Sequence, residues 1–234
     1  MRYVGKTGEF LLRYAVFFVG LTILALGIVL CIQAQLGVSS WDVLQLGLSY
    51  VTPLSVGGAN IFVGIVLVVL TIILTRKRPL MGVLINIVYV GACIDFIFMV
   101  DWIPVFKQVW TQTLMMLLGI GMMGFGSGMY VATKHGAGPR DGLTLALSEK
   151  LGWSIRKVRT VLEMTVLILG WSLGGPVFIG TVIASLAIGP MIQWSMQLWE
   201  KWIERLLGRG VSVENLNERA LRLNHHDGLG RQLR

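Results

Sequence analysis

The sequence predicts an all-α, polytopic membrane protein with six transmembrane helices, arranged as two inverted three-helix repeats. Three observations support this fold class: an apolar composition, a long internal repeat and an uneven distribution of basic residues. Of the 234 residues, 55% are hydrophobic and only 14% are charged, whereas charged residues make up about a quarter of an ordinary soluble domain. The mean hydropathy of +0.73 is typical of a chain that lies largely within a lipid bilayer.

One stretch of the sequence occurs twice and defines the repeating unit. The copies are LGVSSWDVLQLGLSYVTPLSV (36–56) and HGAGPRDGLTLALSEKLGWSI (135–155), at a constant offset of 99 residues. Asp42 therefore aligns with Asp141. Aligned glycines extend the repeat on both sides, with one residue dropped downstream: Gly20 with Gly119, Gly27 with Gly126, Gly82 with Gly180, and Gly91 with Gly189. Each unit thus covers about a hundred residues.

The repeat divides the chain into four parts. We expect a cytoplasmic N-terminus at 1–9, a first three-helix repeat at 10–100, a second at 110–199 and a basic cytoplasmic tail at 200–234. Six apolar runs approach the length of about 20 residues that a helix needs to cross the hydrocarbon. They are 10–34, 57–75, 80–100, 110–133, 157–175 and 177–199. The first run is too long for the core of a signal peptide, and it has an equivalent in the second unit.

Basic residues predict the orientation of these helices. Nineteen of the twenty Lys and Arg residues flank the runs on one side, and only Lys107 lies on the other. Basic residues collect on the cytoplasmic side of membrane proteins, so both termini are expected inside. The same rule explains the sequence pI near 9.9 without a nucleic-acid partner. Because each unit has an odd number of spans, the two units have opposite orientations, as in many secondary transporters.

The repeated stretch predicts a short helix after a glycine turn in each unit. Ser39 or Ser40 is suited to cap the first helix, and Pro139 fits the first helical position of the second. Both helices are apolar nearly all round and too short to cross the bilayer. We therefore expect each of them to be re-entrant or interfacial.

Asp42 and Asp141 lie in the first turns of these short helices, and two interpretations are open. A carboxylate there accepts backbone N–H bonds and favours the positive helix end, which is worth about 0.3–1 kcal/mol. Alternatively, the two aspartates line two gates and bind a cation, a proton or a cationic substrate group; both roles can hold together. Arg140 is a basic neighbour of Asp141, whereas its equivalent Trp41 is neutral, so the two gates should differ electrostatically.

Further polar residues lie within the predicted spans. Arg159 and Glu163 are four residues apart, a spacing that predicts an ion pair on one helix face. Glu163 aligns with Gly64, and an ionisable group within a span is a functional hypothesis, so Glu163 is the best candidate for proton coupling. Asn60 aligns with Arg159; for Asn60, as for Asn86, hydrogen bonding between helices is the simpler explanation.

Other chemistries lack a signal in the sequence. We find no nucleophile–base pair and no phosphate-binding loop, and we expect no enzymatic activity, cofactor or metal site. Cys31 and Cys93 lie in apolar runs, which predicts buried small hydrophobes rather than a disulfide. The segment His225-His226-Asp227 is a weak candidate for metal contact. The glycines at 119–128 predict close helix packing, with a hinge for alternating access as the rival interpretation.

The two copies of the repeated stretch, with the G-x8-G of the last span in each unit, resemble the bacterial YczE/YitT-type integral membrane proteins. The resemblance covers residues 10–199 and leaves the tail outside. It implies a multi-pass protein of the bacterial plasma membrane. It supplies no substrate and no catalytic residues to carry over.

The leading functional hypothesis is a small secondary transporter or permease of an unidentified small molecule. A homo-oligomer in the bilayer is compatible with this hypothesis. The alternative is a non-transporting membrane protein that assists or regulates a partner complex through its basic tail. Loss of function on deletion of 208–234, with alanine tolerated at Asp42 and Asp141, would favour the alternative. A membrane-embedded enzyme is the weakest hypothesis, because no catalytic group has a partner at a recognisable spacing.

Overall fold

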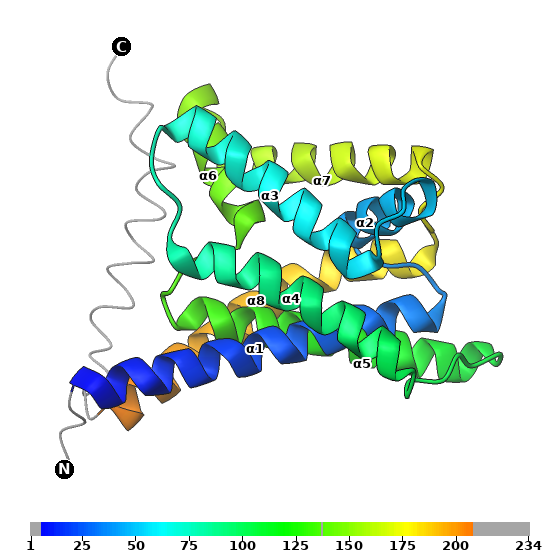
Figure 1. The fold of residues 1–234 in the computed structure, drawn as a ribbon, viewed down its shortest axis with the longest axis horizontal. Helices are drawn as coiled ribbons and strands as arrows, with labels where there is room; N and C mark the ends of the chain where they lie inside the picture. The colour runs from blue at the N-terminus through cyan, green and yellow to red at the C-terminus, as the bar shows by residue number, and fades with distance from the viewer. Residues whose placement is uncertain (1–5, 137, 208–234) are drawn as a thin grey trace.

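The computed structural model describes residues 6–136 and 138–207, and every regular element within these ranges is an α-helix. The helices, in chain order, are α1 (Lys6–Ala34), α2 (Ser40–Val51), α3 (Val56–Thr75), α4 (Met81–Val100), α5 (Val109–Ala132), α6 (Pro139–Leu151), α7 (Ile155–Ser172) and α8 (Ile179–Leu206). The predicted all-α class is confirmed. The two short predicted helices correspond to α2 and α6, which lie at opposite ends of the molecule (Figure 1).

Five helices, α1, α3, α4, α5 and α8, are long and apolar enough to cross a membrane. The remaining predicted span, 157–175, corresponds to α7, which has 18 residues and is not among the five. Arg159 and Glu163 in its first half lower its apolar character. The short helix predicted near 213–223 and the segment His225–Asp227 lie outside the described residues.

The helices run in two opposing sets along the molecule (Figure 1). α1 and α4 run in one direction, and α5 and α8 run in the other. The most extensive packing joins α1 to α5 and α5 to α8. α2 packs mainly against α7, and α6 packs against α3, so each short helix contacts a helix from the other half of the chain.

Glycines allow α1 and α5 to approach closely. A methyl group on Gly27 would lie 2.7 Å from the carbonyl oxygen of Gly119, and one on Gly20 would lie 3.0 Å from that of Gly126. Both distances are shorter than a carbon–oxygen contact allows. Small residues at such a crossing let backbones come together, which is the usual basis of helix association in membranes. The expected role of these glycines in close packing is confirmed at this interface.

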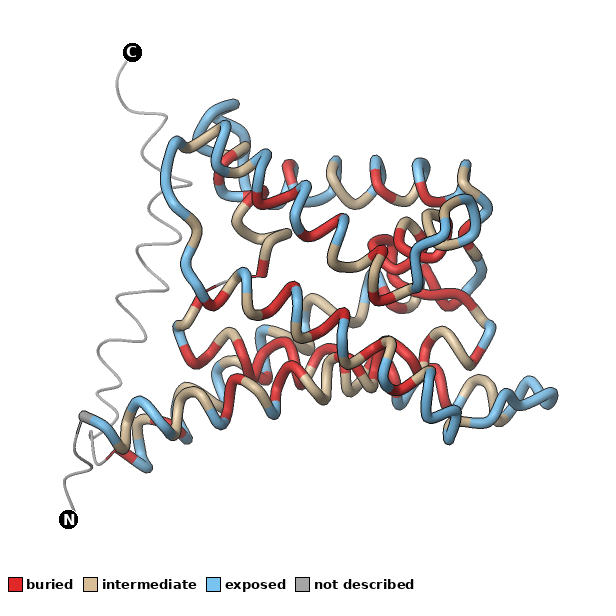
Figure 2. Tube along the Cα trace, in the orientation of Figure 1, coloured by how far each residue is buried: buried red, intermediate tan, exposed pale blue. Residues whose placement is uncertain are grey.

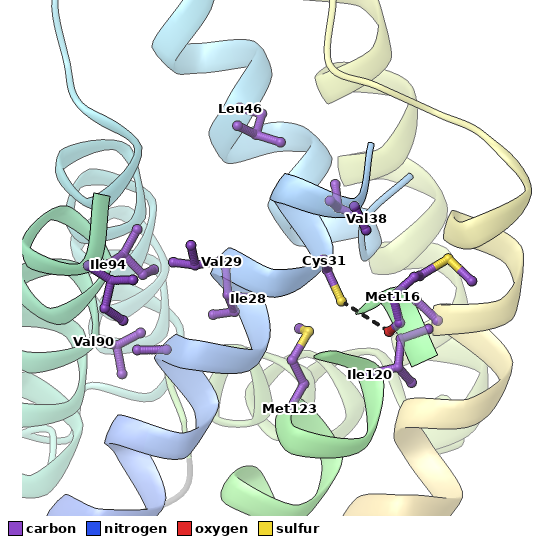
Figure 3. Packing of buried hydrophobic residues seen from close by; sticks show 14 of the residues in the cluster. Ile28, Val29, Cys31, Val38, Leu46, Val90, Ile94, Met116, Ile120 and Met123 are labelled. Carbon is purple, nitrogen blue, oxygen red and sulfur yellow. Dashed lines mark hydrogen bonds between the residues drawn. The ribbon is translucent and has the colours of Figure 1, made fainter. Parts of the chain in front are cut away.

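Apolar side chains fill the space around this crossing (Figure 3). Ile28 and Val29 from α1 lie near Val90 and Ile94 from α4. The thiol of Cys31 donates a 3.7 Å hydrogen bond to the carbonyl oxygen of Met116. Cys31 and Cys93 are both free thiols, as the sequence predicts.

The buried residues face the interior of the helix assembly, whereas the outer faces are exposed (Figure 2). These outer faces are apolar, with Phe62 of α3, Val88 of α4, Met164 of α7 and Leu186 of α8 each more than half exposed. A soluble protein rarely exposes apolar surface on this scale. Lipid contact explains it, because hydrocarbon is as apolar as these side chains.

Candidate functional site

A cavity of about 140 Å³ lies among the helices and is lined by residues from all eight of them. Its polar lining includes Ser39, Ser40, Gln45, Asn60, Asn86, Ser127, Tyr130, Arg140, Asp141, Thr144, Arg159, Glu163 and Ser185. Five of the six site residues proposed from the sequence are in this lining: Asn60, Arg140, Asp141, Arg159 and Glu163. The sixth, Asp42, lies next to the wall residues Ser40 and Trp41 along the chain.

The first turns of α2 and α6 both border the cavity. Ser39 precedes α2 as its N-cap, and Gly138 precedes α6, whose first residue is Pro139 as predicted. The first N–H groups of a helix have no intrahelical acceptor, and the helix dipole makes this end electropositive. Two electropositive helix ends, one from each copy of the repeated stretch, therefore contribute to one cavity.

Asp42 is almost completely buried, with 1% of its surface exposed. Its Oδ2 accepts a 2.5 Å hydrogen bond from the Ser39 hydroxyl, whereas Oδ1 has no hydrogen-bond partner among the described residues. The Nη2 atom of Arg140 lies 3.9 Å from that Oδ1. Burial raises the pKa of the Asp42 carboxyl, and Arg140 and Ser39 oppose this rise. The prediction that Ser39 caps α2 is right in position only, because its side chain makes no capping bond and donates to Asp42 instead.

Arg140 connects the two copies of the repeated stretch. Its guanidinium carbon lies 5.0 Å from the ring centroid of Trp41, the residue that aligns with it in the first copy. This is within the range of a cation–π interaction. Together with the 3.9 Å approach to Asp42, the stacking holds Arg140 of α6 against the first turn of α2.

Asp141 occupies the same sequence position as Asp42 but has different surroundings. It is partly buried and lines the cavity, and no described residue forms a hydrogen bond or an ion pair with its carboxylate. Burial raises its pKa, while the positive charges of Arg159 and Arg140 lower it. Its carboxylate is thus left with capacity for a ligand.

Arg159 and Glu163 form the ion pair that their spacing predicts, with Nε and Oε1 3.1 Å apart. The two side chains are 48% and 30% exposed. An ion pair with this exposure stabilises a fold by about 1 kcal/mol or less. The presence of the pair at the cavity is therefore more informative than its contribution to stability.

Gln45 was not among the residues singled out from the sequence. Its Nε2 donates a 2.9 Å hydrogen bond to Oδ1 of Asn60, but its Oε1 has no partner among the described residues although the side chain is only 2% exposed. A buried carbonyl without a donor costs free energy. The repeat alignment contains a signal for this residue, because Gln45 aligns with Thr144, which lines the same cavity.

Asp95 has a structural role that the sequence did not indicate. Its Oδ2 accepts a 2.6 Å hydrogen bond from the Ser55 hydroxyl, and its Oδ1 accepts a 2.8 Å bond from the Gly57 amide. Asp95 of α4 thereby caps the start of α3. No group of three His, Cys, Asp or Glu residues in the described part of the chain is placed to hold a metal ion.

Known proteins resemble this chain over most of its length. One relative, the "Uncharacterized membrane protein YczE" of Bacillus subtilis (strain 168), is 36% identical over 189 residues, which cover 80% of this chain and 87% of that protein. The "Uncharacterized protein YyaS" of the same organism is 31% identical over 191 residues, covering 81% and 95%. An "Uncharacterized protein" of Haemophilus influenzae is 30% identical over 178 residues, covering 76% and 80%.

No solved structure matches the chain. A family model described as "Family of unknown function (DUF6198)" matches residues 11–197, which include every residue that lines the cavity. This match, the apolar helices and the likeness to YczE show that the chain is a YczE-like integral membrane protein and belongs to the DUF6198 family.

Proposed function

We propose that this membrane protein is a small secondary transporter or permease that binds its substrate in the cavity between two inverted repeats. One observation carries the proposal: equivalent positions of the two copies line the same cavity. These pairs are Trp41 and Arg140, Gln45 and Thr144, Asn60 and Arg159, and Gly64 and Glu163. A substrate site at the interface of inverted repeats is the arrangement found in many transporters.

Contacts between the units support a two-fold relation. Such symmetry requires each contact to recur with both residues exchanged for their equivalents. The close approach of Gly20 to Gly126 recurs as that of Gly119 to Gly27. A second pair of contacts follows the same rule: Gly82 approaches the carbonyl of His135, and Gly180 approaches that of Leu36.

Backbone conformations also recur at the repeat offset. Gly37 and Gly136 both have positive φ, at 103° and 143°. The residues two positions before them, Gln35 and Lys134, are both left-handed, with φ of 57° and 64°. Left-handed backbone is uncommon outside glycine, so its recurrence at equivalent positions supports a common origin for the two turns.

The proposal includes six spans, with α7 as the fifth. Figure 1 supports this, because α7 lies along the long axis of the molecule and runs in the opposite direction to α3, its equivalent in the first unit. The exposed apolar side chains of its second half, including Ile168 and Trp171, suit contact with lipid. The start of α1, the α3–α4 and α5–α6 loops and the end of α8 all lie at one end of the molecule (Figure 1). We place this end on the cytoplasmic side of a bacterial plasma membrane, because most basic residues lie there.

Transport requires the cavity to open to each side in turn. The Arg140–Asp42 and Trp41 contacts join α6 to α2, and Ser40 lies 3.5 Å from Ser185 of α8 through their hydroxyl oxygens. These polar contacts between the units are weak enough to exchange during such a change. We assign proton coupling to Glu163, because it is an ionisable group at the cavity and its partner Arg159 is on the same helix.

Thiol labelling of the cavity tests the proposal. Cys31 and Cys93 are replaced by alanine, and single cysteines are placed at Gln45 or Thr144. A membrane-impermeant thiol reagent is then applied to right-side-out and inside-out vesicles. A transporter exposes the cavity to each side in turn, so we expect both positions to react from both sides.

A cysteine at Val88, which is 56% exposed on the apolar outer face, is the control and should react from neither side. Reaction of the cavity cysteines from only one side, or from neither, would contradict a transport function. The partner-complex alternative depends on the basic tail, whose residues 208–234 lie outside the described residues.

A further inference from the structure

Two neighbouring charged groups of the cavity lining, Arg140 and Asp141, make no side-chain hydrogen bond to a described residue, in contrast to Arg159 and Glu163. Arg140 has five N–H donors, and no described residue accepts a hydrogen bond from its guanidinium; Asp42 Oδ1, at 3.9 Å, is too distant. Asp141 follows it in the chain and has no hydrogen-bond donor or ion-pair partner among the described residues. Arg140 and Asp141 do not pair with each other, so both remain available to a ligand.

Two further features divide the cavity into donors and acceptors. The first turns of α2 and α6 provide electropositive helix ends beside Arg140, which suits an anionic group. The buried Oε1 atom of Gln45, which has no donor among the described residues, is a second acceptor beside the Asp141 carboxylate. An ammonium group has three donors and no acceptor, so it matches these oxygens.

A ligand with a single charge would satisfy only part of this lining. An anion bound to Arg140 would leave the Asp141 carboxylate and the Gln45 carbonyl without donors. A cation bound to Asp141 would leave the guanidinium without an acceptor. Unpaired charges and polar groups are costly once water is excluded.

We infer that the ligand of this cavity is a small zwitterion that carries a carboxylate and an ammonium group, such as a small amino acid; the inference rests on the proposed transport function. Its carboxylate contacts Arg140 and the two helix ends, and its ammonium contacts Asp141 and Gln45. The size agrees, because about 140 Å³ is well below the roughly 300–1,000 Å³ of pockets for drug-sized ligands.

Three probes that differ only in charged groups test this inference. L-Alanine carries both groups, propionate lacks the ammonium, and ethylamine lacks the carboxylate. Each is titrated by equilibrium dialysis against the purified full-length protein in detergent. We expect L-alanine to bind, with propionate and ethylamine weaker by about tenfold or more, because each of these two probes lacks one of the charged hydrogen-bonding groups.

A matched pair of variants locates the site. Arg140→Gln is expected to lose L-alanine binding, whereas Lys150→Gln, which also removes one positive charge but at an exposed position of the same helix, is expected to keep it. Equal binding of propionate or ethylamine, no binding of L-alanine to the wild-type protein, or full binding to Arg140→Gln would each overturn the inference. The vesicle labelling experiment does not use these probes, so cavity access from both sides without L-alanine binding would reject the ligand class and leave the transport function intact.

Discussion

Asp42 and Asp141 occupy equivalent positions in sequence, yet their surroundings give them different roles. Asp42 accepts a hydrogen bond from Ser39 and lies 3.9 Å from Arg140, so it organises the contact between α2 and α6. Asp141 lacks such partners among the described residues and faces the cavity. A structural role at the contact between α2 and α6 therefore fits Asp42, and a ligand-binding role fits Asp141 better.

At the residue scale, Asp141→Asn separates these roles. Asparagine has the same shape and is itself favoured at helix starts, so the thermal stability of the purified protein should not change. Removal of the negative charge should abolish activity in a transport or complementation assay. Glu149→Gln, an exposed change of the same kind on α6, is the control and should be fully active. Full activity of Asp141→Asn would show that this aspartate is only a helix cap.

The sequence indicated part of the cavity lining, because two-fold symmetry would relate equivalent sequence positions in space. Asn60 and Arg159 align, and both line the cavity. Tyr130 and Ser185 also line it, but they lie in apolar runs where no local pattern distinguishes a cavity-facing residue from one that faces a neighbouring helix. Gln45 was missed for a different reason: it lies in the repeated stretch, but its unpartnered oxygen depends on tertiary contacts.

At the scale of the helix, the close approach of α1 and α5 depends on which glycines lie at the contact, and not on how many glycines α5 contains. A methyl group on Gly119 would lie 2.7 Å from Sγ of Cys31 and 2.9 Å from the carbonyl oxygen of Gly27. One on Gly121 would meet only the Cε atom of Met191, at 3.8 Å. Gly119 therefore permits the close approach of α1 to α5, whereas the position of Gly121 has room for a methyl group.

We therefore predict that Gly119→Ala destabilises the protein and Gly121→Ala does not. Overpacking of a tight contact costs about 1–3 kcal/mol, which should appear as a lower melting temperature in detergent. Gly121→Ala is the control, because alanine is favoured over glycine in a helix and meets ordinary contacts here. Equal melting temperatures for the two variants would mean that α1 and α5 are less closely packed than described.

Helix boundaries were predictable where hydropathy alone determines them. The predicted run 57–75 agrees with α3 to within one residue. The run 177–199 ended too early, because α8 continues to Leu206 through a charged segment. Ile203 and Leu207, both buried, pack in a cluster with Val16 of α1, a contact between distant parts of the chain that local hydropathy does not report.

At the scale of the whole molecule, the proposed inverted repeat would explain why one cavity contacts every described helix. α2 and α6 lie at opposite ends of the molecule (Figure 1), and the first turns of both border the cavity, as two units of opposite orientation would require. Parallel units would place both short helices at the same end. The orientation of α2 relative to α6 is therefore the feature on which the site depends.

Surface thiol labelling tests this orientation. Val51 and Lys150 align at the repeat offset, and both are exposed at the ends of α2 and α6. After replacement of the native cysteines by alanine, a cysteine at Val51 should react with an impermeant reagent only from outside intact cells. A cysteine at Lys150 should react only in inside-out vesicles.

Detergent permeabilisation is the control for that experiment and should make both positions reactive. These positions suit a test of orientation better than Gln45 and Thr144, because the cavity residues become accessible to either side during transport. Labelling of Val51→Cys and Lys150→Cys from the same side would require parallel units. The electropositive ends of α2 and α6 would then border the cavity for a reason other than inversion, and the proposed alternating access would lose its structural basis.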